Sequence, residues 1–171
     1  MKKTRQITVT AVLTALYFIL SALLKIPVVG NITLDLGYIV LAVSAVCLGA
    51  VPAAFVGSLG VLLESALMSR RGISPGWILM NAIVGYTCGL VLHKAADGDR
   101  KTFWLKAVVS VTVSMLAGVV VKTFIDCALY GITQIAVKIP SSVTAWILDS
   151  FVMLAAGMPL SLTLKKRIKL P

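Results

Sequence analysis

The chain has 171 residues and a net charge of +10, with 59% hydrophobic residues, 13% charged residues and a mean hydropathy of +1.01. Ordinary soluble domains are about 45–50% apolar and about 25% charged. A water-soluble enzyme and a disordered chain are therefore excluded, and the composition indicates an integral membrane protein whose solvent is lipid.

Six apolar segments are candidates for membrane-spanning helices, at approximately 7–24, 36–51, 53–68, 77–93, 104–130 and 142–164. Gly49 and Pro52 separate the short second and third segments and predict a tight turn, with Pro52 in the first turn of the third helix. The alternative is one kinked segment over 36–68, but about 33 residues would overshoot the hydrocarbon core. We expect residues 1–171 to form a single all-α domain of six transmembrane helices.

The distribution of basic residues predicts the orientation of this bundle. The N-terminus, the segment between the fourth and fifth spans and the C-terminus together carry 11 of the 16 lysines and arginines. Because basic residues are enriched on the cytoplasmic side, we expect both termini to be cytoplasmic in a multi-pass protein of a bacterial-type cytoplasmic membrane. The charge is then an orientation signal, and we expect no nucleic-acid partner.

The three predicted outer loops, 25–35, 69–76 and 131–141, mix glycine or proline with polar and apolar residues. The inner loops are a tight turn and a plain charged stretch. This difference favours a site open to the exterior, although the outer loops are alternatively simple connectors.

Polar residues inside the predicted spans are the candidates for this site. Ionisable residues are costly in lipid and by default face a cavity or a partner. The predicted orientation places four such residues in the outer half of the membrane, Glu64, Lys122, Asp126 and Asp149, together with the neutral polar residue Asn81. Lys122 and Asp126 are four residues apart and share a helical face, so they form either part of a binding site or an ion pair that neutralises itself.

Two further features extend this candidate site. Trp146 and Asp149 are three residues apart, so the indole can stack on a ligand ring while the carboxylate bonds its polar edge. The alternative for Trp146, as for Trp77, is the aromatic belt at the membrane interface. Arg70 and Arg71 lie in an outer loop and either clamp a ligand carboxylate or phosphate or contact lipid headgroups.

Several kinds of catalytic and metal site have no matching motif. The sequence contains neither GxxxxGK[ST] nor HExxH. Cys47, Cys88 and Cys127 are far apart in apolar runs and fit buried small hydrophobes, and His93 at a helix end fits an interfacial or capping role. We expect neither an enzyme nor a bound metal or cofactor.

Small residues at four-residue spacing indicate close helix contacts in lipid. The first span carries Ala11 and Ala15, the fourth carries Gly85 and Gly89, and the fifth carries Ser110, Ser114 and Gly118. Packing within the bundle is sufficient to explain the stripes in the fourth and fifth spans.

Taken together, these features resemble the substrate-binding S components of energy-coupling factor (ECF) vitamin transporters. The resemblance rests on six spans, the basic N-terminus leading into Ala11xxxAla15, and the block from Leu34 to Leu90, which contains LDLGYIVLAVSAVCLGAVPAAFVGSLGVLLE and RRGISPGWILMNAIVGYTCGL. It looks most like the folate and pantothenate branch. The chain departs from it in Gly-Ala-Val-Pro where many relatives read Gly-Pro, and in Glu64 where relatives often carry Asp.

The resemblance implies a function and partners. S components bind a micronutrient from outside with high affinity, in a pocket made by the outer loops and the outer halves of spans four to six. Ala11 and Ala15 would dock on a transmembrane coupling subunit that is joined to two ATPases. The loaded subunit would topple in the membrane to release its cargo, which is folate, pantothenate or a related small heterocycle.

Two rival functions remain open from the sequence. In a self-sufficient proton-coupled secondary transporter, Asp126 and Asp149 would carry protons. In a non-transporting membrane scaffold, the small-residue stripes would serve assembly with partners.

Overall fold

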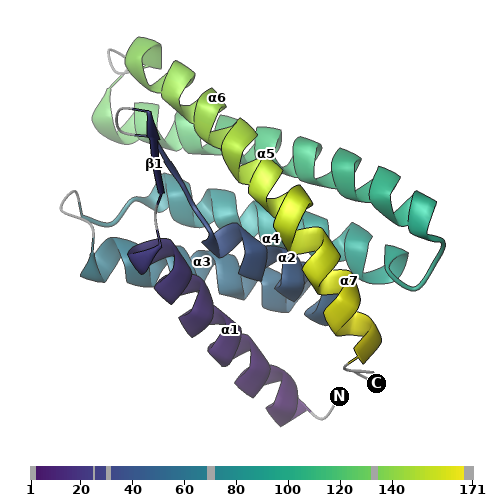
Figure 1. Cartoon of the computed structure of the whole chain (residues 1–171). Coiled ribbons are helices and arrows are strands. Elements are labelled where there is room, and N and C mark those ends of the chain that lie inside the picture. The colour runs from purple at the N-terminus through teal and green to yellow at the C-terminus, as the bar shows by residue number, and fades with distance from the viewer. Residues whose placement is uncertain (1–2, 25, 30–31, 69–71, 132–134, 168–171) are drawn as a thin grey trace.

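The computed structural model describes residues 3–24, 26–29, 32–68, 72–131 and 135–167. These residues form a helical bundle with one small hairpin (Figure 1). The elements in chain order are α1 (Lys3–Leu23), β1 (Ile26–Val29), β2 (Ile32–Leu34), α2 (Gly37–Leu48), α3 (Ala50–Leu67), α4 (Pro75–Ala95), α5 (Arg100–Tyr130), α6 (Ile135–Val152), the π-helical segment η2 (Met153–Gly157) and α7 (Met158–Arg167).

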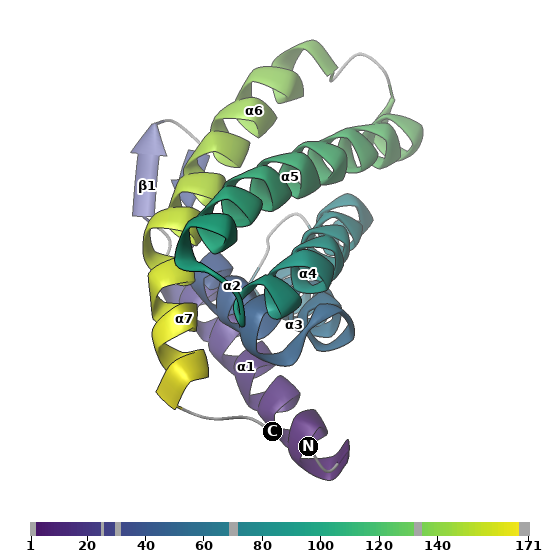
Figure 2. The ribbon, with the colours of Figure 1, turned by 90° about the vertical axis from the view of Figure 1, so that its right-hand side faces the viewer.

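The helices pack in a fixed order around α4 and α2. Figure 2 shows α4 between α3 and α5, and α1 packs against α3 on the far side. Helix α2 contacts α1, α3, α4 and α7, so it occupies the centre of the bundle. The rod formed by α6, η2 and α7 crosses α5 and α2. Across the described residues this gives six helical rods, which confirms the predicted all-helical fold.

Five of these rods are long and apolar enough to cross a membrane, among the residues that the structure describes. The second predicted span, 36–51, is shorter than expected, because α2 ends at Leu48 after 12 residues. At 1.5 Å per residue such a helix is about 18 Å long, well short of a hydrocarbon core of about 30 Å. All its residues except Ile39 are buried, so α2 owes its hydrophobicity to protein packing and not to lipid contact.

The turn between α2 and α3 confirms the prediction of two helices over 36–68. Gly49 alone separates them, with φ +90°, a conformation that favours glycine. Pro52 lies in the first turn of α3 as expected. The His93 imidazole of α4 lies 2.9 Å from the Val46 carbonyl at the end of α2, which confirms the predicted capping role.

The last rod changes its helical pitch before Pro159. Proline has no N–H and its ring crowds the carbonyl four residues earlier, and η2 widens the helix at that point, with the Met158 N–H bonded to the Met153 carbonyl. Gly157 of η2 faces α2, where an added Cβ would lie 2.6 Å from the Cβ of Ala42. The wide turn therefore brings the rod against the central helix.

Two short antiparallel strands occupy part of the predicted outer loop 25–35. Ile26 pairs with Leu34 and Pro27 with Thr33, with an irregularity between Pro27 and Val29. The hairpin connects α1 to α2 at the outer end and contacts α6 through β2. The sequence predicted an outer loop over 25–35 but did not predict these strands.

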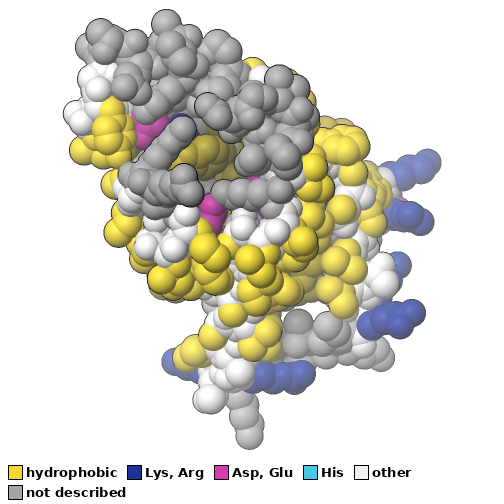
Figure 3. Space-filling model, turned by 60° about the vertical axis from the view of Figure 1, so that its left-hand side comes forward, with side chains coloured by type: hydrophobic (Ala, Val, Ile, Leu, Met, Phe, Trp, Pro, Cys, Tyr) yellow, Lys and Arg dark blue, Asp and Glu magenta, His cyan; other side chains and the backbone are white. Residues whose placement is uncertain are grey.

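The surface carries exposed apolar side chains along its helices and basic side chains toward one end, as expected of a membrane protein. Exposed apolar side chains recur every four residues along α3, at Val51, Phe55, Leu59, Leu63 and Leu67. Helix α1 begins and α7 ends at the same end of the bundle (Figure 1), as an even number of spans demands. Lysine and arginine side chains gather toward that end, away from the hollow described below (Figure 3).

Glycine in α4 permits its close contact with α3, which predicts a selective loss of stability. A Cβ on Gly85 would collide with the backbone of Ala53. One on Gly98 would lie 3.5 Å from the Ala95 carbonyl oxygen, an ordinary contact distance. We expect Gly85→Ala to cost about 1–3 kcal/mol because the helices must move apart. Gly98→Ala, the matched control, should leave the unfolding temperature in detergent unchanged. Equal unfolding temperatures for the two variants would contradict this packing.

Candidate ligand-binding site

A buried ion pair lies at the outer end of α5. The Lys122 Nζ is 2.9 Å from the Asp126 Oδ2, and both residues are buried. The same ammonium lies 4.8 Å from the centre of the Trp77 ring of α4, in cation–π geometry. The structure therefore confirms that Lys122 and Asp126 share one face of α5. It also shows that Trp77 of α4 contacts the lysine on that face.

The first turn of α4 completes the surroundings of this pair. Gly76 is packed so closely that an added Cβ would lie 2.9 Å from the Asp126 Oδ1. The Asp126 Oδ1 is buried without a hydrogen-bond partner among the described residues, so the pair retains one unused acceptor.

A second cluster joins α6, α1 and the start of α2. The Asp35 backbone N–H donates to the Asp149 Oδ1 over 3.4 Å. The Asp35 Oδ1 accepts from the Ser21 hydroxyl and from the Gly37 N–H, each over 2.7 Å. Asp35 thus links the first residue of α2 to α1. Asp149 is 3% exposed, which places its carboxylate inside the protein and not in lipid.

Asn81 connects the two clusters. The Tyr17 hydroxyl donates to the Asn81 Oδ1 over 3.2 Å, and the Asn81 Nδ2 donates to the Trp77 carbonyl over 3.0 Å. Tyr17 lies one turn before Ser21 on α1. The result is a continuous line of polar groups across the outer half of the bundle, here called the polar chain: Asp149, Asp35, Ser21, Tyr17, Asn81, Trp77, Lys122 and Asp126.

Two buried donors beside the polar chain have no hydrogen-bond partner among the described residues. They are the Tyr38 hydroxyl of α2 and the Trp146 Nε1 of α6. Trp146 is one helical turn from Asp149. Unpaired buried donors are rare in native proteins and require an explanation. Figure 3 shows the outer end hollowed, with hydrophobic and acidic side chains visible there.

The structure brings together most of the predicted site residues, but not all of them are described. Asn81, Lys122, Asp126 and Asp149 belong to the polar chain. Glu64 is half-buried in α3. Arg70 and Arg71 lie outside the described residues.

Sequence reasoning missed four members of this region: Tyr17, Ser21, Asp35 and Tyr38. A signal existed for Asp35, because an aspartate directly before Leu-Gly and a long apolar run is typical of a helix N-terminus. No comparable signal marked Tyr17 or Ser21, whose side chains are neutral and lie within an apolar span.

The predicted docking residues lie on the outside of the bundle. Ala11 and Ala15 are both exposed, whereas α1 buries only Thr14, Tyr17 and Ser21. The stripe in α4 is internal, since Gly89 packs on Ala50 of α3. Among the described residues no three histidine, cysteine, aspartate or glutamate side chains are grouped to hold a metal.

Comparison with known proteins establishes the family. The family described as "ECF-type riboflavin transporter, S component" matches residues 1–166. The chain belongs to this family. Its members are transporter subunits and not enzymes, and the apolar helices of this S component make it a multi-pass membrane protein.

The sequence relatives of this S component include two bacterial UPF0397 proteins. It is 32% identical to a UPF0397 protein of Onion yellows phytoplasma (strain OY-M) over 108 residues, which are 63% of this chain and 56% of the relative. It is 31% identical to a UPF0397 protein of Streptococcus thermophilus (strain ATCC BAA-491 / LMD-9) over 86 residues, 50% of this chain and 47% of the relative. The chain spans about half the length of these curated relatives.

Two solved structures share the fold of this S component. The crystal structure of FolT bound with folic acid has a TM-score of 0.69 at 16% identity and covers 90% of both chains. The S component of a bacterial ECF transporter has a TM-score of 0.65 at 20% identity, covering 96% of this chain and 99% of the other. The predicted S-component bundle is therefore confirmed at the level of the fold.

Proposed function

We propose that the chain is the membrane-embedded subunit that binds a vitamin or vitamin-like micronutrient for uptake. The observation that carries this proposal is the set of buried, unpartnered polar atoms at the outer end, namely the Tyr38 hydroxyl, the Trp146 Nε1 and the Asp126 Oδ1. A ligand with a polar ring would supply the missing hydrogen bonds. Membership of a family of vitamin-transporter S components supports this assignment.

Each predicted residue has a distinct role in this proposal. Trp146 stacks on the ligand ring, and Asp149 accepts from a donor at its edge. Lys122 is already neutralised by Asp126 and rests on Trp77, so an anionic tail is better met by Arg70 and Arg71. Asn81 uses its amide oxygen and one amide hydrogen within the protein, while Glu64 adds a further acceptor.

Transport requires partners that the chain does not contain. The sequence has no nucleotide-binding motif of its own. We propose that it docks on a transmembrane coupling subunit with two ATPases in the cytoplasmic membrane, and that toppling of the loaded subunit delivers the ligand. The exposed Ala11 and Ala15 on α1 support this docking face, since small side chains allow close helix approach in lipid.

Bulky residues on this face are expected to separate binding from transport. An Ala11→Leu/Ala15→Leu variant should lower uptake by the complete transporter about tenfold while leaving ligand affinity unchanged, because both side chains point away from the polar chain. Uptake of the radiolabelled ligand in proteoliposomes with the coupling module checks this. Val12→Leu, on the exposed side of the same helix, is the control for added bulk. Parental uptake by the double variant would contradict the docking assignment.

The ligand itself is identified by mass spectrometry of small molecules extracted from the purified protein. Riboflavin, folate and pantothenate are the first compounds for titration against the stripped protein, followed by related small heterocycles. Absence of any extracted ligand, together with no response to these compounds, would overturn the proposal. Uptake driven by a pH gradient in liposomes that contain only this chain would instead favour the proton-coupled transporter, with Asp126 and Asp149 as carriers.

A further inference from the structure

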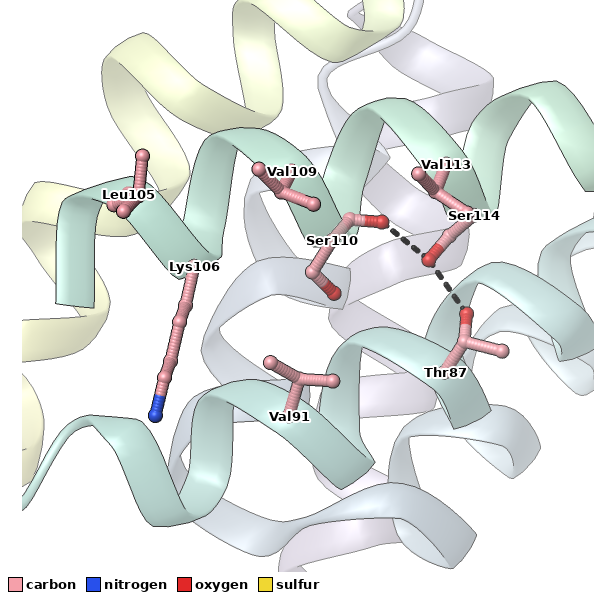
Figure 4. Close-up of a pocket in the computed structure, with 8 residues that line it drawn as sticks. All are labelled: Thr87, Val91, Leu105, Lys106, Val109, Ser110, Val113 and Ser114. Atoms are coloured by element: carbon pink, nitrogen blue, oxygen red, sulfur yellow. Dashed lines mark hydrogen bonds between the residues drawn. The ribbon is translucent and has the colours of Figure 1, made fainter. Parts of the chain in front are cut away.

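A groove of about 390 Å³ lies between α4 and α5 on the inner half of the bundle (Figure 4). It is separate from the polar chain, because Ser114 on its wall lies eight residues, or about 12 Å, from Lys122 along α5. Val91 of α4 and Val109 of α5 line it and are 41% and 54% exposed. Those exposed valines lie on lipid-facing helix surfaces, so the groove opens to the membrane and not to water.

One row of residues on α5 explains why the groove forms. Gly118, Ser114, Ser110 and Lys106 follow one another at four-residue spacing and share a face. Gly118 packs against Met80 of α4. One turn further in, the Thr87 hydroxyl donates to the Ser114 hydroxyl over 2.7 Å. The two helices are thus in contact at these two levels.

The next two levels of the same row are Ser110 and Lys106. The Ser110 hydroxyl is buried without a hydrogen-bond partner among the described residues, and its side chain points from α5 toward α4 (Figure 4). Lys106, one turn further, is exposed and has no ion-pair partner within the described part of the chain. The inner end of the groove therefore contains the unpaired Ser110 hydroxyl and the exposed Lys106 ammonium, next to walls formed by apolar side chains.

We propose that this groove binds one anionic glycerophospholipid of the inner leaflet. Its phosphate pairs with Lys106, an ester carbonyl accepts from Ser110, and an acyl chain lies along Val91 and Val109. Lys106 and Ser110 lie one helical turn apart, about 6 Å along α5, with the lysine nearer the inner end. Basic pockets between helices on the cytoplasmic side are typical sites for anionic headgroups.

The geometry favours a lipid over a helix of a partner protein. A helix with its side chains is about 10–12 Å wide, whereas α4 and α5 are joined by a hydrogen bond at one end of the groove. An acyl chain fits such a narrow space. The site also contains a cation at the headgroup level, which an apolar partner helix would leave unpaired.

Native mass spectrometry of the delipidated protein tests the proposal, with phosphatidylglycerol and phosphatidylcholine of identical acyl chains as probes. The parent should bind phosphatidylglycerol more tightly. Lys106→Gln should weaken phosphatidylglycerol binding about fivefold, the effect of one basic residue on an anionic lipid, and leave phosphatidylcholine unchanged. Lys3→Gln, at the same end of the bundle on α1, is the matched control and should bind as the parent does.

A second pair of variants tests the groove itself. Ser110→Leu fills the space and should abolish the specific lipid, whereas Ser110→Ala keeps the space and should weaken binding only in part. Circular dichroism and elution volume verify that each variant is folded. Parental phosphatidylglycerol binding by both Lys106→Gln and Ser110→Leu would overturn the proposal, as would equal affinity of the parent for the two lipids. The proposal would also be overturned if Ser110→Leu no longer captured the coupling subunit while its lipid binding was unchanged. The groove would then bind a helix of a partner protein and not a lipid.

Discussion

An Asp149→Asn variant is expected to bind its micronutrient ligand about 10- to 100-fold more weakly than the parent. A hydrogen bond to a charged group contributes about 1.5–3 kcal/mol, and the substitution removes that charge. The amide oxygen of asparagine still accepts from the Asp35 N–H that now bonds the Asp149 Oδ1. The contact between α6 and the start of α2 therefore survives, and the effect falls on the ligand.

Trp146→Leu is expected to reduce affinity by a similar factor, because leucine fills space but neither stacks on a ring nor donates from an Nε1. The matched control is Trp104→Leu, since Trp104 packs edge-on against Phe103 at the inner end of α5, with ring centroids 6.1 Å apart. Titration with the ligand extracted from the parent gives all four affinities. Parental affinity in both Asp149→Asn and Trp146→Leu would show that this pocket is wrongly assigned.

Hydropathy alone located the helices because lipid-exposed and buried helices are both apolar. For the same reason, hydropathy did not distinguish the buried helix α2 from a lipid-exposed one. Its 12 residues were predicted as a short membrane span, and only the packing shows that protein surrounds it on all sides. Length was the informative signal there, since about 18 Å of helix does not cross a hydrocarbon core.

Intramembrane charges were a reliable guide to the polar region. Lys122, Asp126 and Asp149 are costly in lipid, and each is buried in the structure. Neutral groups such as Tyr17 and Ser21 carry no such cost and stayed hidden. Their role depends on contacts between helices distant in sequence, as in the Tyr17–Asn81 hydrogen bond.

The small-residue stripes show that a local sequence pattern does not predict whether a helix face is internal or exposed. Gly85xxxGly89 and Ala11xxxAla15 are equivalent signals in sequence, yet the first packs inside against α3 and the second is exposed on α1. Which face a stripe occupies depends on the rotation of its helix within the bundle. That rotation is set by the buried side chains around it, here Tyr17 against Gly60.

The second large effect is expected at the buried ion pair. Lys122→Met leaves the Asp126 carboxylate buried without its cation, and removal of one partner from such a pair costs about 3–5 kcal/mol. Replacing both, in Lys122→Met/Asp126→Leu, removes the charges together and should restore most of the stability. The unfolding temperature of the ligand-free protein in detergent measures each change.

The double variant also separates the two interpretations of this pair. If Lys122 and Asp126 serve packing alone, the double variant recovers both stability and ligand affinity. Under the proposed function the unused Asp126 Oδ1 accepts a hydrogen bond from the ligand, which instead predicts recovered stability with weakened ligand binding. Lys122→Met with the unfolding temperature of the parent would mean that water, not protein, surrounds the carboxylate. The pair would then contribute to neither the fold nor a dry binding site.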